Sequence, residues 1–96
     1  MAYEWDQQKA QRNYRKHGVA FDEAASVFLD PMALTYSDPD HSEDEEREIT
    51  IGISGGGRVL FVSHCERPGG VRLISARRAT RKEIRQYEQA YEPRER

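Results

Sequence analysis

Residues 58–78 read RVLFVSHCERPGGVRLISARR, two apolar segments joined by a short turn. Arg58–Glu66 and Val71–Arg78 are apolar at most positions on both faces, which indicates strands that are covered on both sides. The turn Arg67–Gly70 contains one Pro and two Gly residues, and a turn of this kind favours an antiparallel pair. We therefore expect these two strands at the centre of an antiparallel sheet.

Further strands are expected before this pair. Every second residue of Arg47–Ile53 from Ile49 onward is isoleucine, which is the period of a half-buried strand, and Ser54–Gly57 then predicts a hairpin turn. Met32–Tyr36 is a candidate fourth strand. The intervening segment Ser37–Glu48 carries seven Asp or Glu residues and no apolar residue, which predicts a solvated loop. Its acidic residues lack the Gly and terminal Glu of a calcium loop, so we expect no metal there.

Three helices are expected around the sheet. The first runs from Gln7 to His17, with Asp6 as its N-cap and Gly18 as its stop signal. Asp22 caps a second, apolar-faced helix that ends at Asp30-Pro31. A capping box at Thr80–Glu83 opens a third helix that extends to about Tyr91. Together with Tyr3–Trp5 as a candidate edge strand, this pattern predicts an α+β fold with three to four antiparallel strands, two N-terminal helices and a C-terminal helix.

Length and composition limit the class of protein. Ninety-six residues predict one domain, residues 1–96, and a single cysteine, Cys65, allows no internal disulfide. We therefore expect a reducing compartment, the cytoplasm. The longest aliphatic or aromatic run, Val59–Val62, is far shorter than a membrane span, and the N-terminus has no signal-peptide pattern. No cofactor motif is found.

The charge distribution suggests a polyanionic partner. Glu66–Arg85 contains seven Lys or Arg and two Glu, a local balance of +5 in a chain whose net charge is −2. Such a reversal predicts a compact cationic surface, and phosphate groups are its natural ligand. The structural alternative is a solvated helix entrance at the basic residues Arg77, Arg78, Arg81 and Lys82.

A single histidine in the central pair provides acid–base chemistry. RNA can be cut without a metal when a base takes the 2′-hydroxyl proton and cations hold the phosphate. A four-residue turn would place His64 opposite Leu73 and Leu60 opposite Arg77, so that His64 and Arg77 share a face. A one-residue change of register would separate them. The structural alternative for His64 is a satisfied strand histidine.

Motifs along nearly the whole chain resemble the BrnT toxins, also described as the DUF497 family. The motifs are Glu4-Trp5-Asp6, Lys9, Asn13, Lys16–Val19, Phe21, Asp30-Pro31, Arg47, Thr50–Gly52, His64, Arg67, Arg72–Ala79, Arg81–Glu83 and Tyr87-Glu88. The resemblance implies a RelE-like ribonuclease fold and the toxin role in a type II toxin–antitoxin pair. It also implies a BrnA-like antitoxin with a ribbon-helix-helix domain, which neutralises the toxin and binds the operator DNA of the shared operon.

The resemblance assigns roles to the basic residues. His64, Arg67, Arg77 and Arg78 are expected to be catalytic in RNA cleavage. Arg47, Arg72, Arg81 and Lys82 are expected to bind the RNA substrate. The alternative function, from another class, is a non-catalytic nucleic-acid- or protein-binding module that uses the same basic surface.

Overall fold

The computed structural model describes residues 2–40 and 46–90. In chain order its elements are β1 (Ala2–Glu4), α1 (Gln7–His17), α2 (Phe21–Ala25), the 3-10 helix η1 (Ser26–Leu29), β2 (Leu34–Ser37), β3 (Arg47–Ile53), β4 (Val59–Arg67), β5 (Gly70–Arg78) and α3 (Arg81–Gln89). The predicted α+β class is confirmed. The predicted end of the last helix near Tyr91 and the centre of the acidic segment lie outside the described residues.

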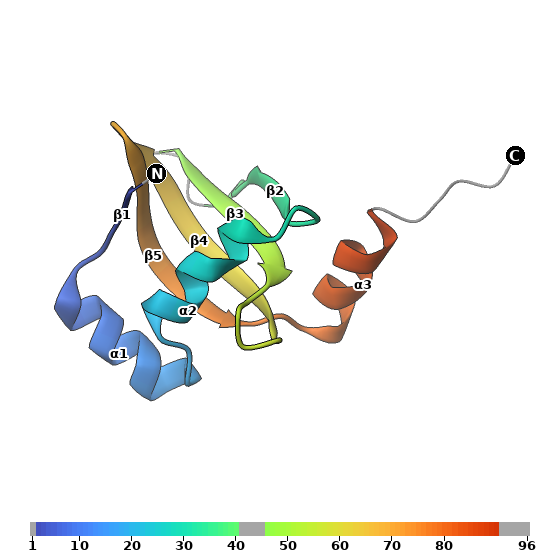
Figure 1. Ribbon diagram of the computed structural model, residues 1–96, viewed down its shortest axis with the longest axis horizontal. Helices are drawn as coiled ribbons and strands as arrows, with labels where there is room; N and C mark the ends of the chain where they lie inside the picture. Colours follow the sequence, from blue (N-terminus) through green and yellow to red (C-terminus); the bar gives the residue numbers. More distant parts are fainter. Residues whose placement is uncertain (1, 41–45, 91–96) are drawn as a thin grey trace, which may run out of the picture.

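The sheet has five strands in the order β1-β5-β4-β3-β2 (Figure 1). The four strands β2 to β5 pair antiparallel, as expected. β1 adds a parallel strand at the edge, so the predicted wholly antiparallel sheet of three to four strands is wrong there. Gly70 permits this pairing because a Cβ atom at its position would lie 1.9 Å from the Ala2 carbonyl oxygen. A parallel pair of three residues leaves little trace in a sequence pattern.

The first helix has the predicted bounds. The Asp6 carboxylate accepts hydrogen bonds from the backbone N–H groups of Gln8 and Lys9, at 2.8 and 3.1 Å, which satisfies donors that the first helical turn cannot pair. Gly18 ends the helix with φ of 69°, a left-handed conformation that favours glycine. Both signals were readable because they depend on local chemistry alone.

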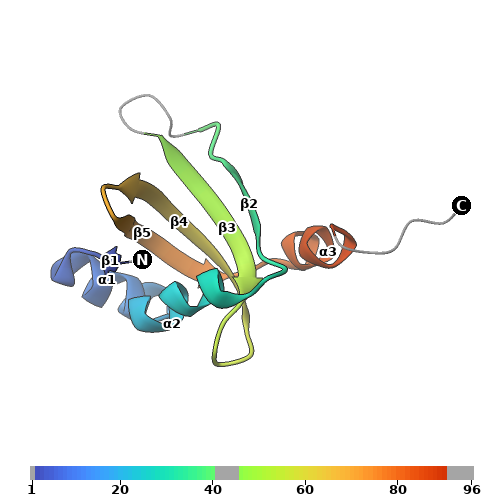
Figure 2. The same cartoon turned by 45° about the horizontal axis from the view of Figure 1, so that its top comes forward.

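The N-terminal helices cover one face of the sheet, and α3 lies apart from them (Figures 1 and 2). The main core joins α2 and η1 to β4 and β5 through the buried residues Val19, Phe21, Ala24, Val27, Leu60, Val62, Val71, Leu73 and Ala76. On the opposite face, Tyr87 of α3 packs against Ile49 and Ile51 of β3. Within the described residues, no helix is both long and apolar enough to cross a membrane.

The second expected helix consists of two short elements. α2 begins at Phe21, one residue before the predicted cap, and the chain tightens into η1 at Ser26. The Ser26 hydroxyl donates to the Glu23 carbonyl at 2.5 Å and accepts the Gly55 N–H at 2.7 Å. Ser26 thus joins this bend to the hairpin turn between β3 and β4.

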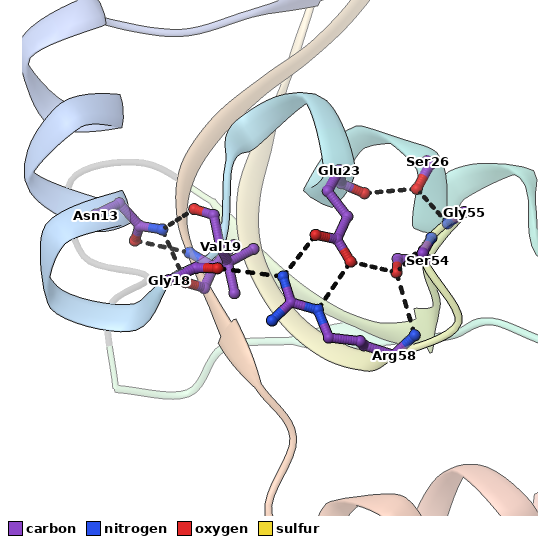
Figure 3. Close-up of polar contacts among 10 residues, drawn as sticks. Asn13, Gly18, Val19, Glu23, Ser26, Ser54, Gly55 and Arg58 are labelled. Atoms are coloured by element: carbon purple, nitrogen blue, oxygen red, sulfur yellow. Dashed lines mark hydrogen bonds and ion pairs between the residues drawn. The ribbon is translucent and has the colours of Figure 1, made fainter.

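A charged side chain reinforces the same connection (Figure 3). The Arg58 guanidinium donates to both oxygens of the Glu23 carboxylate, at 2.5 and 3.0 Å, and to the Gly18 carbonyl at 3.2 Å. The Ser54 hydroxyl donates a further hydrogen bond to Glu23 at 2.6 Å. The hydrogen bond from Arg58, followed by that from Ser54, lowers the pKa of Glu23 below its ordinary value of 4.5.

This network predicts an acid-dependent loss of stability. Because the pKa of Glu23 is lower in the folded state, its stabilisation is complete above pH 4.5 and is lost as the pH falls through the folded value. We expect Glu23→Gln to lower the free energy of unfolding by about 1–2 kcal/mol at neutral pH, and by less in acid. Urea unfolding of both proteins at about pH 7 and pH 3 tests this, and an equal difference at both values would contradict it.

Candidate active site

A β-bulge sets which side chains share a face of the central pair. Ser63 of β4 pairs with Ser75 of β5, but the next residue, His64, pairs with Leu73. Ile74 is therefore the extra residue, and the alternation of side chains along β5 shifts by one position there. The predicted pairing of His64 with Leu73 is confirmed.

The bulge separates the expected catalytic residues. Beyond it, Leu60 pairs with Arg78 and Phe61 with Arg77, so the predicted pairing of Leu60 with Arg77 is wrong. Paired residues lie on the same face of a sheet. Arg77 therefore shares the α3 face with Phe61, whereas His64 lies on the face that the N-terminal helices cover.

His64 is buried and electrically neutral at physiological pH. Its Nε2 atom is 2.7 Å from the Thr50 hydroxyl, which is itself 2.7 Å from the Thr35 hydroxyl. Its ring packs edge-on against Phe28, with ring centroids 4.9 Å apart. With 3% of its surface exposed, burial lowers the pKa of His64 from 6.5 to about 4. The ring therefore has one proton to share between its two nitrogens.

The second ring nitrogen of His64 has a carboxylate nearby but no hydrogen bond to it. Nδ1 is buried and has no hydrogen-bond partner among the described residues. The Glu48 carboxylate is the neighbour, with Oε1 4.0 Å from Nδ1, too far for a hydrogen bond. A buried polar atom without a partner is rare in folded proteins and costs about 1–3 kcal/mol. His64 thus differs from the fully satisfied strand histidine of the structural alternative.

A cavity of about 460 Å³ adjoins this histidine. His64 and Glu48 line it together with Arg67 from the end of β4, while Phe28, Thr35, Glu66, Gly69, Gly70 and Val71 complete the wall. The structure thus brings together two of the expected catalytic residues, His64 and Arg67. A guanidinium and an imidazole thus line one cavity, and both are side-chain types that phosphate chemistry uses.

Arg77 performs a structural task on the other face. Its guanidinium donates to both carboxylate oxygens of Glu83 in α3, at 2.9 and 3.0 Å, and stacks 3.9 Å from the centre of the Phe61 ring. Burial alone would raise the pKa of Glu83, but hydrogen bonds from Arg77 and from the Thr80 backbone outweigh it and lower the pKa. Arg77 therefore holds the start of α3 on the sheet.

The remaining expected site residues are dispersed. Arg47 and Arg72 pair with Cys65 from opposite sides, which places all three in one row on the α3 face. Arg78 lies at the far end of β5, four residues beyond Ile74. The last two, Arg81 and Lys82, are exposed in the first turn of α3. The structure does not gather the eight basic and histidine side chains into one site.

Two residues of the site were missed in the sequence. Glu48 pairs directly with His64 across the β3–β4 ladder; in the sequence it lay where the expected acidic loop and the expected strand overlap, and we did not assign it to the site. Thr50, fully buried, holds the imidazole. The alternation expected along this strand already places both on the face opposite the isoleucines, but only the register with β4 reveals His64 as their neighbour. Among the described residues, no three His, Cys, Asp or Glu side chains lie close enough to hold a metal ion.

The Thr50 contact gives a stability prediction. Thr50→Val keeps the shape of the side chain but leaves Nε2 of the buried imidazole without its partner. We expect the free energy of unfolding to fall by about 1–3 kcal/mol. Urea unfolding measures the change. The matched control is Thr35→Val, because the exposed Thr35 hydroxyl bonds to Thr50 and not to His64, and its loss of unfolding free energy should be smaller. Equal stability of Thr50→Val and the parent would show that the hydrogen bond does not fix the ring.

Comparison with known proteins identifies the family. A family model described as the ribonuclease toxin BrnT of type II toxin–antitoxin systems matches residues 5–83. The chain belongs to the BrnT family. The resemblance seen in its motifs is thus confirmed, and the match spans every described element from α1 to the first turn of α3.

A solved BrnT structure agrees with this membership. The crystal structure of the ribonuclease toxin BrnT from Brucella abortus is similar to the chain with a TM-score of 0.63 and 25% sequence identity. The similarity covers 84% of this chain and all of the Brucella chain. Among curated protein sequences, none matches the chain. By its family the chain is a BrnT-type toxin of a type II toxin–antitoxin system, and its fold agrees with that of the Brucella ribonuclease toxin.

Proposed function

We propose that this BrnT chain is an endoribonuclease that cuts RNA at the cavity formed by His64, Glu48 and Arg67. The observation that carries the proposal is the buried His64 imidazole, whose Nδ1 atom has no hydrogen-bond partner among the described residues and faces a carboxylate 4.0 Å away. Perturbed titratable groups in a cavity are a common property of catalytic sites.

The proposed chemistry divides acid–base work from charge stabilisation. Glu48 is one-third exposed, so its carboxylate can contact an RNA 2′-hydroxyl and take its proton. In this scheme the carboxylate and Nδ1 of the shielded His64 ring, 4.0 Å apart in the free protein, close to hydrogen-bond distance when RNA binds, so that His64 orients Glu48 and shares the proton that it has taken. The 2′-oxygen forms a bond to phosphorus, the bond to the 5′-oxygen breaks, and that oxygen takes a proton from solvent. Arg67 would stabilise the added charge on the phosphate, as a guanidinium does in other phosphoryl reactions.

The remaining basic residues have different proposed parts. Arg77 is engaged with Glu83, so we assign it to positioning α3 rather than to the reacting phosphate. Arg78 and the expected substrate-binding residues Arg47, Arg72, Arg81 and Lys82 would attract RNA by charge without touching the scissile bond. The reaction needs no metal in this scheme, because base, orienting group and cation all come from side chains.

We infer a BrnA-like ribbon-helix-helix antitoxin as the partner. An active ribonuclease must be inhibited in its own cell, and membership of a type II family supports a protein inhibitor. Operator DNA would be contacted through the antitoxin and not through the toxin. The lone, buried Cys65 is compatible with the cytoplasm as the shared compartment.

Incubation of purified toxin with single-stranded RNA in EDTA tests the proposed activity. We expect cut RNA that ends in a 2′,3′-cyclic phosphate, because the 2′-oxygen is the nucleophile. A strand with 2′-deoxy sugars should remain intact. RNA that is bound in a salt-sensitive manner but never cut, in vitro or after expression of the toxin without antitoxin, would favour the non-catalytic binding module. Cutting that requires added magnesium would refute the metal-free scheme.

A further inference from the structure

The first helix carries an unbalanced positive charge. Its eleven residues include Lys9, Arg12, Arg15 and Lys16 and no Asp or Glu. α1 therefore contributes four positive charges to a chain whose net charge is −2, so the other residues carry −6. All four side chains are exposed, and none forms an ion pair with a carboxylate among the described residues.

Helix stability does not explain these positions. A helix dipole favours cations in the last turn, which accounts for Arg15 and Lys16. Lys9 lies in the first turn, where the same dipole disfavours a cation, and Arg12 lies in the middle. Like charges three or four residues apart also repel by about 0.2–0.5 kcal/mol per pair. The carboxylate near these cations belongs to the N-cap Asp6. The hydrogen bond from the Lys9 backbone N–H is the main cause that lowers the pKa of Asp6, and the charges of Lys9 and Arg12 lower it further.

Three of the cations line one groove. Lys9, Arg12 and Lys16 line a cavity of about 330 Å³ between α1 and β5, together with Asn13, His17, Ile74 and Ser75. Arg15 points elsewhere and lines a different cavity, between α1 and α2. The β-bulge at Ile74 forms part of the floor, and the exposed Ser75 lines the groove beside it. We call this feature, defined by Lys9, Arg12, Lys16 and Ser75, the α1 groove.

We propose that the α1 groove binds the sugar–phosphate backbone of single-stranded RNA, outside the cleavage cavity. Lys9 and Lys16 are seven residues apart, which corresponds to about 10.5 Å along the helix and gives room for more than one phosphate. β5 contributes to both sites, through Gly70 and Val71 at the cleavage cavity and Ser75 at the α1 groove. The two sites are thus about 13–17 Å apart along one strand. This inference rests on RNA as the substrate.

The composition of the groove favours RNA over a protein partner. The centre of a protein–protein interface is depleted in charged residues and relies on apolar anchors. In the α1 groove the apolar side chain is Ile74, and three of the seven lining residues are Lys or Arg. Such a surface gains affinity by releasing counterions from a nucleic-acid backbone.

Binding of an uncleavable RNA tests the proposal apart from catalysis. The probe is a fluorescent 12-nucleotide RNA with a 2′-O-methyl group on every sugar, titrated with full-length toxin at several salt concentrations. We expect Lys9→Gln/Arg12→Gln/Lys16→Gln to weaken binding at least tenfold and to reduce the salt slope by about 2, given about 0.7 per phosphate contact. The matched control is Arg15→Gln, the same residue type on another face of the same helix, which should change affinity less than threefold.

The outcomes separate this proposal from the proposed activity. Equal affinity and salt slope for the triple variant and the parent would overturn the α1 groove as an RNA site, even if the parent cuts RNA. Loss of antitoxin binding by the triple variant at unchanged RNA affinity would likewise overturn it and assign the groove to a protein. A parent that binds RNA through the groove but never cuts it would support the groove and refute the proposed activity.

Discussion

Replacing His64 with Gln is expected to slow RNA cleavage by about a hundredfold or more, the usual contribution of a positioned acid–base group. Gln has a similar volume and can still bond to Thr50, but it cannot share a proton with Glu48. The loss should appear in the single-turnover rate, with RNA affinity changed little. Toxicity on expression without antitoxin should disappear in parallel.

Stability and partner measurements control this experiment. The fold should persist, because the core on this face is built by aliphatic residues around His64 and Gln retains one of its polar contacts. Thermal unfolding and antitoxin binding of the His64→Gln variant should therefore stay close to those of the parent. Cleavage at the parental rate by a folded His64→Gln protein would return His64 to the role of a structural residue.

Replacing Asn13 with Ala is expected to give the largest loss of stability, about 2–5 kcal/mol. The buried amide donates to the Val19 carbonyl oxygen at 3.0 Å (Figure 3). It also donates to the Ala76 carbonyl oxygen at 2.9 Å and accepts the Ala76 N–H at 3.1 Å. β1 pairs with β5 only as far as Arg72, so Asn13 satisfies the edge of β5 where no strand does. Its removal leaves three buried backbone groups unpaired.

A neighbouring position supplies the control for Asn13. Gln11→Ala removes an exposed amide from the same helix, and such surface changes usually alter stability by less than about 0.5 kcal/mol. The free energy of unfolding should be measured for both variants in urea. Equal losses for Asn13→Ala and Gln11→Ala would show that the hydrogen bonds to β5 do not hold α1 on the sheet.

The sequence predicted those elements whose signals are local. α1 has its expected bounds because Asp6 and Gly18 act through their own backbone neighbours, and α3 opens at the expected capping box. The edge strand expected at Tyr3–Trp5 is present as β1, one residue earlier, but its parallel pairing could not be predicted, since it depends on a distant glycine, Gly70. The change from α2 to η1 likewise depends on the Ser26 contact with Gly55, far along the chain.

The arrangement of the candidate site also depends partly on contacts that local sequence signals do not reveal. His64 and Arg67, two of the residues expected to be catalytic, both line one cavity at the end of β4, and their catalytic role stays a prediction. The separation of Arg77 follows from one extra residue in β5. The sequence carried a signal of this bulge, because the apolar positions of the strand change from odd numbers, Val71 and Leu73, to even numbers, Ile74 and Ala76. When the pairing of two strands is counted outward from the turn, each residue is assumed to have one partner, so an extra residue in one strand is missed.

In the proposed scheme, RNA is cut at the cavity that His64, Glu48 and Arg67 line, and not beside Arg77, which is engaged with Glu83. The single-turnover cleavage rates of Arg67→Gln and Arg77→Gln, compared at equal fraction folded, test it most directly. The account predicts a loss of about a hundredfold for Arg67→Gln, because a transition-state donor is removed. Arg77→Gln should lower stability but cut RNA within a few-fold of the parent. A folded Arg77→Gln protein that has lost cleavage, beside an active Arg67→Gln protein, would contradict the account.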